Sequence, residues 1–282
     1  MVERSRTLSL LAHAVMIIGV LIILFPVYLA FVASTHTPAD VMQAPMPLLP
    51  GSHFWESYSA ALSGSGHTST HASVARMIWI SFATACIITV GKIAISLLSA
   101  FAVVYFRFPL RGVFFWLIFI TLMLPVEVRI GPTYQVVADL HMINTYAGLS
   151  VPLIASATAT FLFRQFFLTV PDELVEAARM DGAGPMRFFK DILVPLSVNS
   201  IAALFVIQFI YGWNQYLWPL IMATSEDMYP VVVGILQMIG QGESPVDWNV
   251  VMATAMLAML PPALVVIVMQ KWFVRGLVET EK

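Results

Sequence analysis

The sequence predicts an all-α integral membrane protein, a single bundle of six transmembrane helices with both termini in the cytoplasm. Of its 282 residues, 59% are hydrophobic and only 11% are charged, whereas soluble domains are about 45–50% apolar and about 25% charged. Six apolar windows are each long enough for the roughly 20 residues that a membrane-crossing helix needs. Lysine and arginine gather on one side of these windows, and that asymmetry orients the bundle.

The six windows are 8–34, 77–106, 112–136, 146–168, 198–224 and 250–274. The first follows Arg4 and Arg6, as the apolar part of a signal peptide would. It is much longer than the roughly 7–15 apolar residues of a cleavable signal, so we expect a retained span. The chain contains no long internal repeat and no interdomain linker, and we therefore expect one transmembrane domain over 1–282.

The positive charges predict which connections face the cytoplasm. One side of the spans carries most of them, namely Arg4, Arg6, Arg107, Arg111, Arg164, Arg179, Arg187, Lys190, Lys271, Arg275 and Lys282. Only Arg76 falls in a loop on the other side, and Lys92 and Arg129 fall inside spans. Because cytoplasmic loops carry the excess of lysine and arginine, loops 35–76, 137–145 and 225–249 are predicted to be external.

Several function classes lack their usual signals. No Gly-x-x-x-x-Gly-Lys-Ser/Thr run is present, so we expect no nucleotide phosphate loop in this chain. No basic stripe indicates nucleic-acid binding, and Cys86 is the only cysteine, which rules out a disulfide within the chain. His67 and His71 are four residues apart, but they follow Gly64-Ser65-Gly66, which disfavours the helix that a metal pair would need. We expect a solvated loop there and no metal site.

The charged cytoplasmic connection 169–197 is unusual in so apolar a chain. We expect Thr169 to cap a helix with Pro171 in its first turn, and Gly182 to end that helix. A second short helix is expected to end at Pro195. An amphipathic helix lying on lipid is the alternative, but it would carry bulky apolar residues and many cations. The first helix instead has small residues and largely acidic charges, which favours docking to a protein.

At these residues the chain resembles a known family. Glu176-Ala177-Ala178, then Gly182, Ile192 and Pro195, resemble the EAA loop of permease subunits in binding-protein-dependent ABC importers. Val194 departs mildly from the leucine that is usual before that proline. The resemblance implies the type I ABC importer permease fold and a non-catalytic subunit. Seven residues would couple it to an ATPase, namely Glu176, Ala177, Ala178, Asp181, Gly182, Ile192 and Pro195.

Other segments carry the resemblance further. Residues 213–220 are similar to a motif of the carbohydrate-uptake (maltose-type) branch. Segments 107–111, 121–130 and 156–167 resemble the second permease subunit of bacterial sn-glycerol-3-phosphate importers. The resemblance implies a bacterial inner-membrane importer of sn-glycerol-3-phosphate or glycerophosphodiesters. Its partners would be a second, homologous permease in a heterodimer, two copies of an ATPase that holds ATP and Mg, and a periplasmic binding protein. No cofactor is expected on this chain.

The same resemblance suggests that part of loop 225–249 reaches into the binding protein. Its tip would be residues 234–242, bracketed by glycines that permit a tight reversal. The expected contacts are Gly234, Gln237, Gly240 and Gly242.

Three charged residues inside spans are candidates for the substrate pathway. Lys92, Glu127 and Arg129 would each cost at least about 2.5–3.5 kcal/mol at the bilayer centre, so they are expected to face a cavity or a partner. Arginine suits phosphate because its guanidinium donates two parallel hydrogen bonds. The alternative is a structural ion pair between spans or with the partner permease. Trp213, Asn214, Gln215 and Tyr216 could line the pathway, or serve packing and gating.

Other functions remain to be weighed. A secondary transporter would show symmetry between its halves, and none is visible. An intramembrane enzyme would need a nucleophile and base in the spans, where His13 is the only histidine. A permease for a different sugar or polyol is the nearest alternative.

Overall fold

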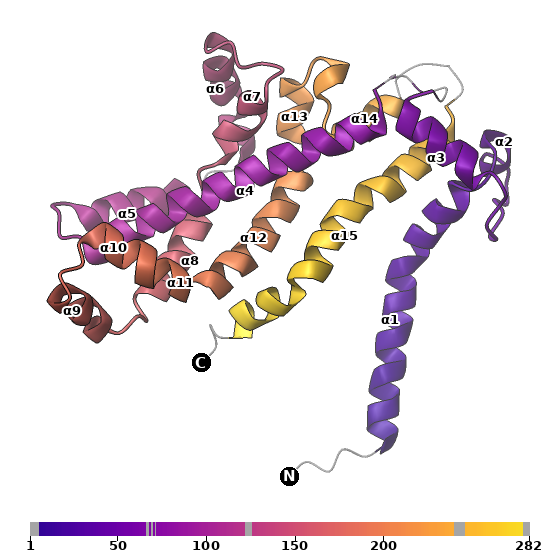
Figure 1. The fold of residues 1–282 in the computed structure, drawn as a ribbon. Helices are drawn as coiled ribbons and strands as arrows, with labels where there is room; N and C mark the ends of the chain where they lie inside the picture. The colour runs from indigo at the N-terminus through magenta and orange to yellow at the C-terminus, as the bar shows by residue number, and fades with distance from the viewer. Residues whose placement is uncertain are drawn as a thin grey trace. The chain divides into compact units, whose positions relative to one another are not determined.

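The structure, a computed structural model, describes residues 6–65, 68, 70, 72–121, 126–239 and 246–278. Its described part is helical and contains no strand (Figure 1). The α-helices are α1 (Arg6–Ala33), α2 (Pro38–Val41), α3 (Phe54–Ser63), α4 (Val74–Tyr105), α5 (Arg111–Ile120), α6 (Val126–Asp139), α7 (Tyr146–Ser150), α8 (Ala157–Phe167), α9 (Asp172–Met180), α10 (Pro185–Phe188), α11 (Val194–Leu196), α12 (Val198–Trp213), α13 (Leu217–Met222), α14 (Val231–Ile239) and α15 (Trp248–Val278). Short turns of other helix types are η2 (Val151–Leu153), η3 (Phe189–Leu193) and η4 (Glu226–Met228).

Three helices in the described part, α1, α4 and α15, are long and apolar enough to cross a membrane. Two further candidates are bent pairs of helices. Tyr146–Leu153 and Ala157–Phe167 meet at 49°, and Pro185–Leu196 and Val198–Trp213 meet at 72°. Counting each pair as one span gives five. The six-span count and the side of the termini stay predictions.

Some of the predicted windows contain more than one helix. The third window, 112–136, contains two helices, α5 and α6, and residues 122–125 between them lie outside the described residues. The fifth window, 198–224, is broken at 214–216, between α12 and α13. Asn214 ends α12, and its backbone N–H still donates to Ile210 O. Membrane transporters tolerate such breaks where the freed backbone groups find protein or a water-filled cavity.

The chain divides into two compact units. The first comprises Met1–Met77 and Gly234–Leu260, and the second comprises Ile78–Val233 and Pro261–Lys282. Within the first unit, Phe54 of α3 stacks on Tyr58 with ring centroids 4.1 Å apart. Asn249 Nδ2 donates to Ser57 Oγ at 2.9 Å, which ties the start of α15 to α3. His67 and His71 lie outside the described residues.

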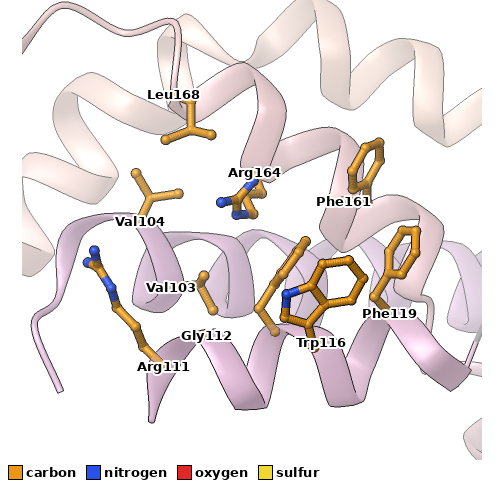
Figure 2. A pocket seen from close by; sticks show the side chains of 10 residues that line it. Val103, Val104, Arg111, Gly112, Trp116, Phe119, Phe161, Arg164 and Leu168 are labelled. Carbon is orange, nitrogen blue, oxygen red and sulfur yellow. The ribbon is translucent and has the colours of Figure 1, made fainter. Parts of the chain in front are cut away.

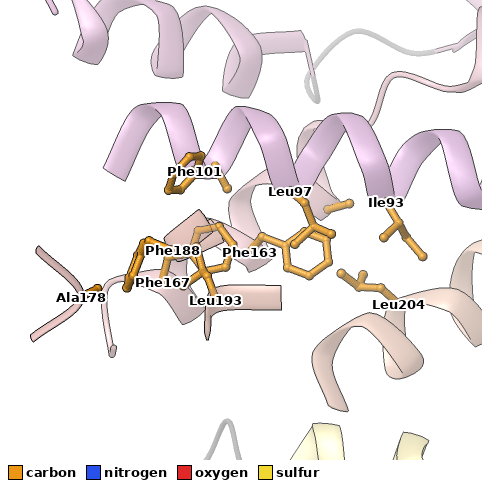
Figure 3. Packing of buried hydrophobic residues seen from close by; sticks show 11 residues of the cluster. Ile93, Leu97, Phe101, Phe163, Phe167, Ala178, Phe188, Leu193 and Leu204 are labelled. Carbon is orange, nitrogen blue, oxygen red and sulfur yellow. The ribbon is translucent and has the colours of Figure 1, made fainter. Parts of the chain in front are cut away.

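The second unit is organised around an aromatic and aliphatic core (Figure 3). Four helices supply most of it: α4 contributes Ile93, Leu97 and Phe101, α8 contributes Phe163 and Phe167, α12 contributes Leu204, and α10 contributes Phe188. Ala178 of α9 is also part of this core and is only 5% exposed. The charged connection 169–197 is therefore packed onto the same core as the long helices.

Helices α4 and α12 approach each other closely in the second unit. A Cβ added at Gly212 would lie 3.0 Å from the Ala85 Cα. Small residues allow backbones in membranes to come this near, and such contacts replace the missing hydrophobic drive between spans. This contact sets the spacing of the two helices that hold the site described next.

Candidate functional site

A cavity of about 370 Å³ lies among α4, α6, α8 and α12, within the second unit. Ten residues line it: Lys92, Thr121, Arg129, Ala155, Ser156, Ala157, Thr158, Ile207, Gln208 and Tyr211. Among these described residues, two are cations and none is acidic. Lys92 and Arg129, predicted from the sequence as intramembrane charges, are thus brought to one cavity.

Lys92 is buried, with 5% of the residue exposed. Its Nζ donates to Gln208 Oε1 at 3.1 Å and lies 3.7 Å from the centroid of the Tyr211 ring. The amide oxygen and the negative face of the ring both favour a cation. Neither partner carries a charge, so the described contacts of Lys92 leave its positive charge available to an anion in the cavity.

The start of α8 forms another wall. Ser156 caps this helix, and its Oγ accepts from Ala159 N at 3.3 Å. Ser96 Oγ, one turn beyond Lys92 on α4, donates to Ser156 O at 3.3 Å and holds the helix start in place. The first N–H groups of an α-helix have no intrahelical acceptor, and the helix dipole is positive at this end. The wall therefore adds to the attraction for an anion.

Arg129 lies on α6 and is exposed. It lines the main cavity and also a smaller one of about 60 Å³, with Thr133 and Trp218 among the neighbours. Thr133 Oγ1 donates to Arg129 O at 2.7 Å, which occupies the backbone and leaves the guanidinium unconstrained by that bond. The side chain of Glu127 lies outside the described residues, so the expected pairing with Arg129 stays a hypothesis.

The arrangement suits a small anion that also carries hydroxyl groups. Lys92 and Arg129 supply charge, the α8 N-terminus supplies N–H dipoles, and Thr158 and Gln208 supply polar groups. A phosphate monoester matches this set, because arginine and helix N-termini are both effective phosphate partners. No nucleophile and base need to be invoked, since these groups bind and orient.

The motif of the fifth span does not reach this cavity's lining. Trp213 is buried, with its ring 5.9 Å from that of Phe209. Asn214, Gln215 and Tyr216 form the break after α12, and Gln215 Nε2 donates to Tyr211 O at 3.1 Å. These three residues follow directly after α12, the helix that carries Gln208 and Tyr211, but they are not among the ten residues that line the cavity.

Eight of the ten lining residues were not predicted from the sequence, and five of these are polar: Thr121, Ser156, Thr158, Gln208 and Tyr211. Gln208 had a signal, because it is a polar residue in an apolar window. Ser156 also had one, as a serine two residues ahead of Thr158 at a helix start. Their role depends on α8 and α12 meeting α4, which no local pattern specifies.

The predicted coupling segment contains helix α9, which begins at Asp172. The expected cap at Thr169 is wrong: its Oγ1 donates to Phe166 O at 2.7 Å, and Pro171 precedes α9 without a side-chain cap. Of the three residues of the predicted motif, Ala178 is buried whereas Glu176 and Ala177 are exposed. Only the latter two present the small and charged face outward.

The end of α9 follows the expectation. Asp181 is its C-cap, and the next residue, Gly182, has a φ of 73°. This left-handed conformation is strained for residues that have a Cβ. Both residues are exposed. The second short helix is a longer run than expected, from α10 through η3 to α11, and it includes Ile192 and Pro195.

Segment 225–249, predicted to be an external loop, differs from its prediction at Gly234. Gly234 does not allow a reversal, because it lies inside α14 and a Cβ there would overlap the side chain of buried Met77. Its lack of a side chain serves close packing. Gln237 lies in the same helix and is half-buried. Gly240 and Gly242 lie outside the described residues.

Comparisons with known proteins agree with this picture. A family model described as the binding-protein-dependent transport system inner membrane component matches residues 92–279. Proteins named sn-glycerol-3-phosphate transport system permease protein UgpE are similar over their full lengths. The one from Brucella melitensis is 57% identical over 282 residues and the one from Yersinia enterocolitica is 58% identical over 283, each with 100% of both chains covered.

The fold has a solved counterpart. A chain of a bacterial ABC transporter involved in the import of the acidic polysaccharide alginate superposes with a TM-score of 0.78 at 24% identity. The match covers 97% of this chain and 99% of that one, and it shows the permease fold. From the family model and the full-length relatives together, the chain belongs to the family of inner membrane components of binding-protein-dependent transport systems.

Proposed function

We propose that this chain is a permease subunit that passes sn-glycerol-3-phosphate, or glycerophosphodiesters, from a periplasmic binding protein into the cytoplasm. The observation that carries the proposal is the cavity in which Lys92 and Arg129 face the N-terminus of α8. The full-length relatives are named for sn-glycerol-3-phosphate transport, which supports the same substrate class.

The electrostatics favour transient binding. An anion leaving water for a low-dielectric region is costly to desolvate unless charges and hydrogen bonds replace the water. Lys92 and Arg129 provide that replacement. Lys92 keeps Gln208 and Tyr211 as neutral partners, so the subunit remains stable when the anion has left. The cavity can therefore release its cargo without leaving a buried cation unsolvated.

Coupling to the energy source is assigned to α9. Its outward residues Glu176, Ala177 and Asp181 would contact an ATPase, together with Met180, which is 84% exposed. We assign ATP and Mg binding and hydrolysis to that partner. The working assembly would contain a second, homologous permease, two ATPase copies and the binding protein, with segment 225–249 contacting the last.

The test is uptake of sn-glycerol-3-phosphate by vesicles that contain the complete importer, divided by the amount of assembled complex. Arg129→Gln should lower uptake per complex by about tenfold, since a charge-assisted hydrogen bond to phosphate is worth about 1.5–3 kcal/mol. Arg129→Lys should retain part of the uptake, because lysine keeps the positive charge but cannot donate two parallel hydrogen bonds to the phosphate.

The same experiment separates the structural alternative. If Arg129→Gln lowers only the amount of assembled complex, and uptake per complex is unchanged, Arg129 is a structural ion-pair partner. The phosphate would then be handled elsewhere.

A neutral sugar or polyol is the second candidate substrate, favoured by the segment 213–220 that resembles sugar permeases. It predicts a different outcome. Arg129→Gln would then leave uptake of the neutral solute unchanged, and sn-glycerol-3-phosphate would not compete for uptake.

A further inference from the structure

A second cationic pocket lies at the opposite end of α8, away from the cavity that contains Lys92. Its volume is about 390 Å³, and α4, α5 and α8 form its walls (Figure 2). Ten residues line it: Val103, Val104, Arg111, Gly112, Phe115, Trp116, Phe119, Phe161, Arg164 and Leu168. Eight are apolar or glycine, two are arginines, and none is acidic.

The two arginines come from different helices. Figure 2 shows Arg164 projecting from α8 and Arg111 from α5 into the same pocket. The guanidinium carbon of Arg164 lies 4.4 Å from the centroid of the Phe115 ring. Its Nε is buried and has no hydrogen-bond partner among the described residues. Arg164 therefore lines the pocket with one buried donor unpaired, and no described residue of the lining has an acceptor side chain.

The start of α5 reinforces the positive potential. This helix has ten residues, and its N-cap, Leu110, provides no side-chain hydrogen bond to the first turn. Gly112 in that turn has no atom of other segments within 4 Å of where a Cβ would be, so the approach to the backbone is open. First-turn N–H groups and the helix dipole both attract anions.

The remaining lining excludes a fully hydrated ion as the best ligand. Phe115, Trp116, Phe119 and Phe161 form an aromatic wall that continues from the arginines along α5 and α8. Trp116 is 59% exposed, and tryptophan is enriched where the headgroup region of a bilayer meets the hydrocarbon. Cations at one end and an apolar wall beyond them match a molecule with an anionic head and an apolar tail.

We propose that this pocket binds the headgroup of an anionic phospholipid, with the phosphate between Arg111 and Arg164 and the first part of an acyl chain along Trp116 and Phe119. Arg164 lies in the last turn of α8, the helix that precedes α9, and Arg111 lies at the start of α5 in the same pocket. The lipid therefore belongs to the cytoplasmic leaflet if α9 faces the ATPase, a placement that rests on the proposed function. The binding site itself does not depend on it.

The test uses the complete importer complex, stripped of lipid and then titrated with phosphatidylglycerol or phosphatidylcholine. Native mass spectrometry counts the bound lipids. Phosphatidylglycerol with brominated tails should also quench part of the tryptophan fluorescence, and that part of the quenching should be absent in Trp116→Phe. We expect selective retention of phosphatidylglycerol, with about fivefold weaker binding in Arg111→Gln and in Arg164→Gln, the effect of one charge near an anionic lipid.

Arg107→Gln is the matched control. It removes the same charge four residues from Arg111, but Arg107 lines a different cavity under α9, so lipid binding should not change. Arg111 is exposed, so its variant tests the proposal even if Arg164→Gln folds poorly. Arg164→Lys should keep most of the binding, because it retains the charge.

Three results would overturn the proposal. Equal phosphatidylglycerol binding by all variants would show that the arginines do not hold a headgroup. Displacement of the lipid by inorganic phosphate or free glycerol phosphate would show that a soluble anion is the ligand. Loss of assembled complex in the two glutamine variants, with lipid per complex unchanged, would show that a protein partner covers the pocket.

Discussion

Lys92 occupies a position where a cation is expensive, and its neighbours explain how it is tolerated. Gln208 supplies a hydrogen-bond acceptor at 3.1 Å and Tyr211 supplies an aromatic face at 3.7 Å. A carboxylate in place of Gln208 would satisfy the lysine better and would cancel the charge that the cavity offers. The neutral pair therefore keeps the cavity cationic.

Two substitutions at Gln208 should separate stability from transport. Gln208→Leu removes an acceptor from a buried cation and should lower the free energy of unfolding by about 1–3 kcal/mol. Gln208→Glu should keep the subunit folded but reduce uptake per complex, because the carboxylate neutralises Lys92. Thermal unfolding of the complex and vesicle uptake measure the two effects. Equal uptake by Gln208→Glu and the unchanged protein would contradict the role of Lys92.

At this scale the sequence predicts part of the cavity. Lys92 and Arg129 stand out because charges inside apolar windows are rare. Gln208 and Lys92 are separated by 116 positions, and their hydrogen bond depends on the angle and spacing of two helices. Neither quantity is encoded in a local pattern, so the partner of Lys92 could not be named from the sequence.

Among the elements, the pair α4 and α12 is the frame of the cavity. Gly212 and Ala85 bring the helices together two turns before Lys92 on α4, and Gln208 lies one turn before Gly212 on α12. The distance between Lys92 and Gln208 is therefore controlled by a contact that carries no charge.

Gly212→Leu tests this frame. The leucine must displace the Ala85 backbone, which costs about 1–3 kcal/mol for overpacking, and it should reduce uptake by moving Gln208 away from Lys92. Gly19→Leu in α1 is the matched control, since no atom lies within 4 Å of its added Cβ. Assembly, thermal unfolding and uptake are compared for both. Equal behaviour of the two variants would contradict the frame.

Helix α9 yields a prediction about docking. Gly182 is exposed, and no described atom of another segment lies within 4 Å of a Cβ placed there, so a side chain there starts in open space. Gly182→Ala and Gly182→Trp share the strain of a positive φ, about 1–2 kcal/mol. Only the tryptophan should abolish ATPase docking, measured by co-purification of the ATPase with the permease pair. Normal docking of Gly182→Trp would remove α9 from the proposed contact.

The elements also show where sequence reasoning stops. The apolar windows located α1, α4 and α15 closely, because length and hydropathy suffice for an unbroken span. They did not show the break at 214–216, since Asn214 and Gln215 are compatible with a helix. The prediction for Gly234 was wrong for a different reason. A glycine in a loop window suggests a turn, but here it makes room for Met77.

For the whole molecule, the distribution of lysine and arginine predicts sidedness that single cysteines can measure. In a Cys86→Ser background, a cysteine at Ser65 should react with an impermeant thiol reagent in intact cells. A cysteine at Gly184 should react only after the membrane is opened. Both residues are exposed, so access within the chain does not limit either reaction. Labelling of Gly184 in intact cells would reverse the orientation.

The core of the second unit connects the cavity physically with α9. Ile93, next to Lys92, and Leu204, one turn from Gln208, are packed in the same core as Ala178 of α9. If docking on α9 shifts this core, it changes the affinity of the cavity for its anion by some factor. Linkage then requires the anion to change the affinity of the chain for the ATPase by that same factor, because coupling free energies are reciprocal. An anion bound in the cavity would thus change the affinity with which α9 binds the ATPase.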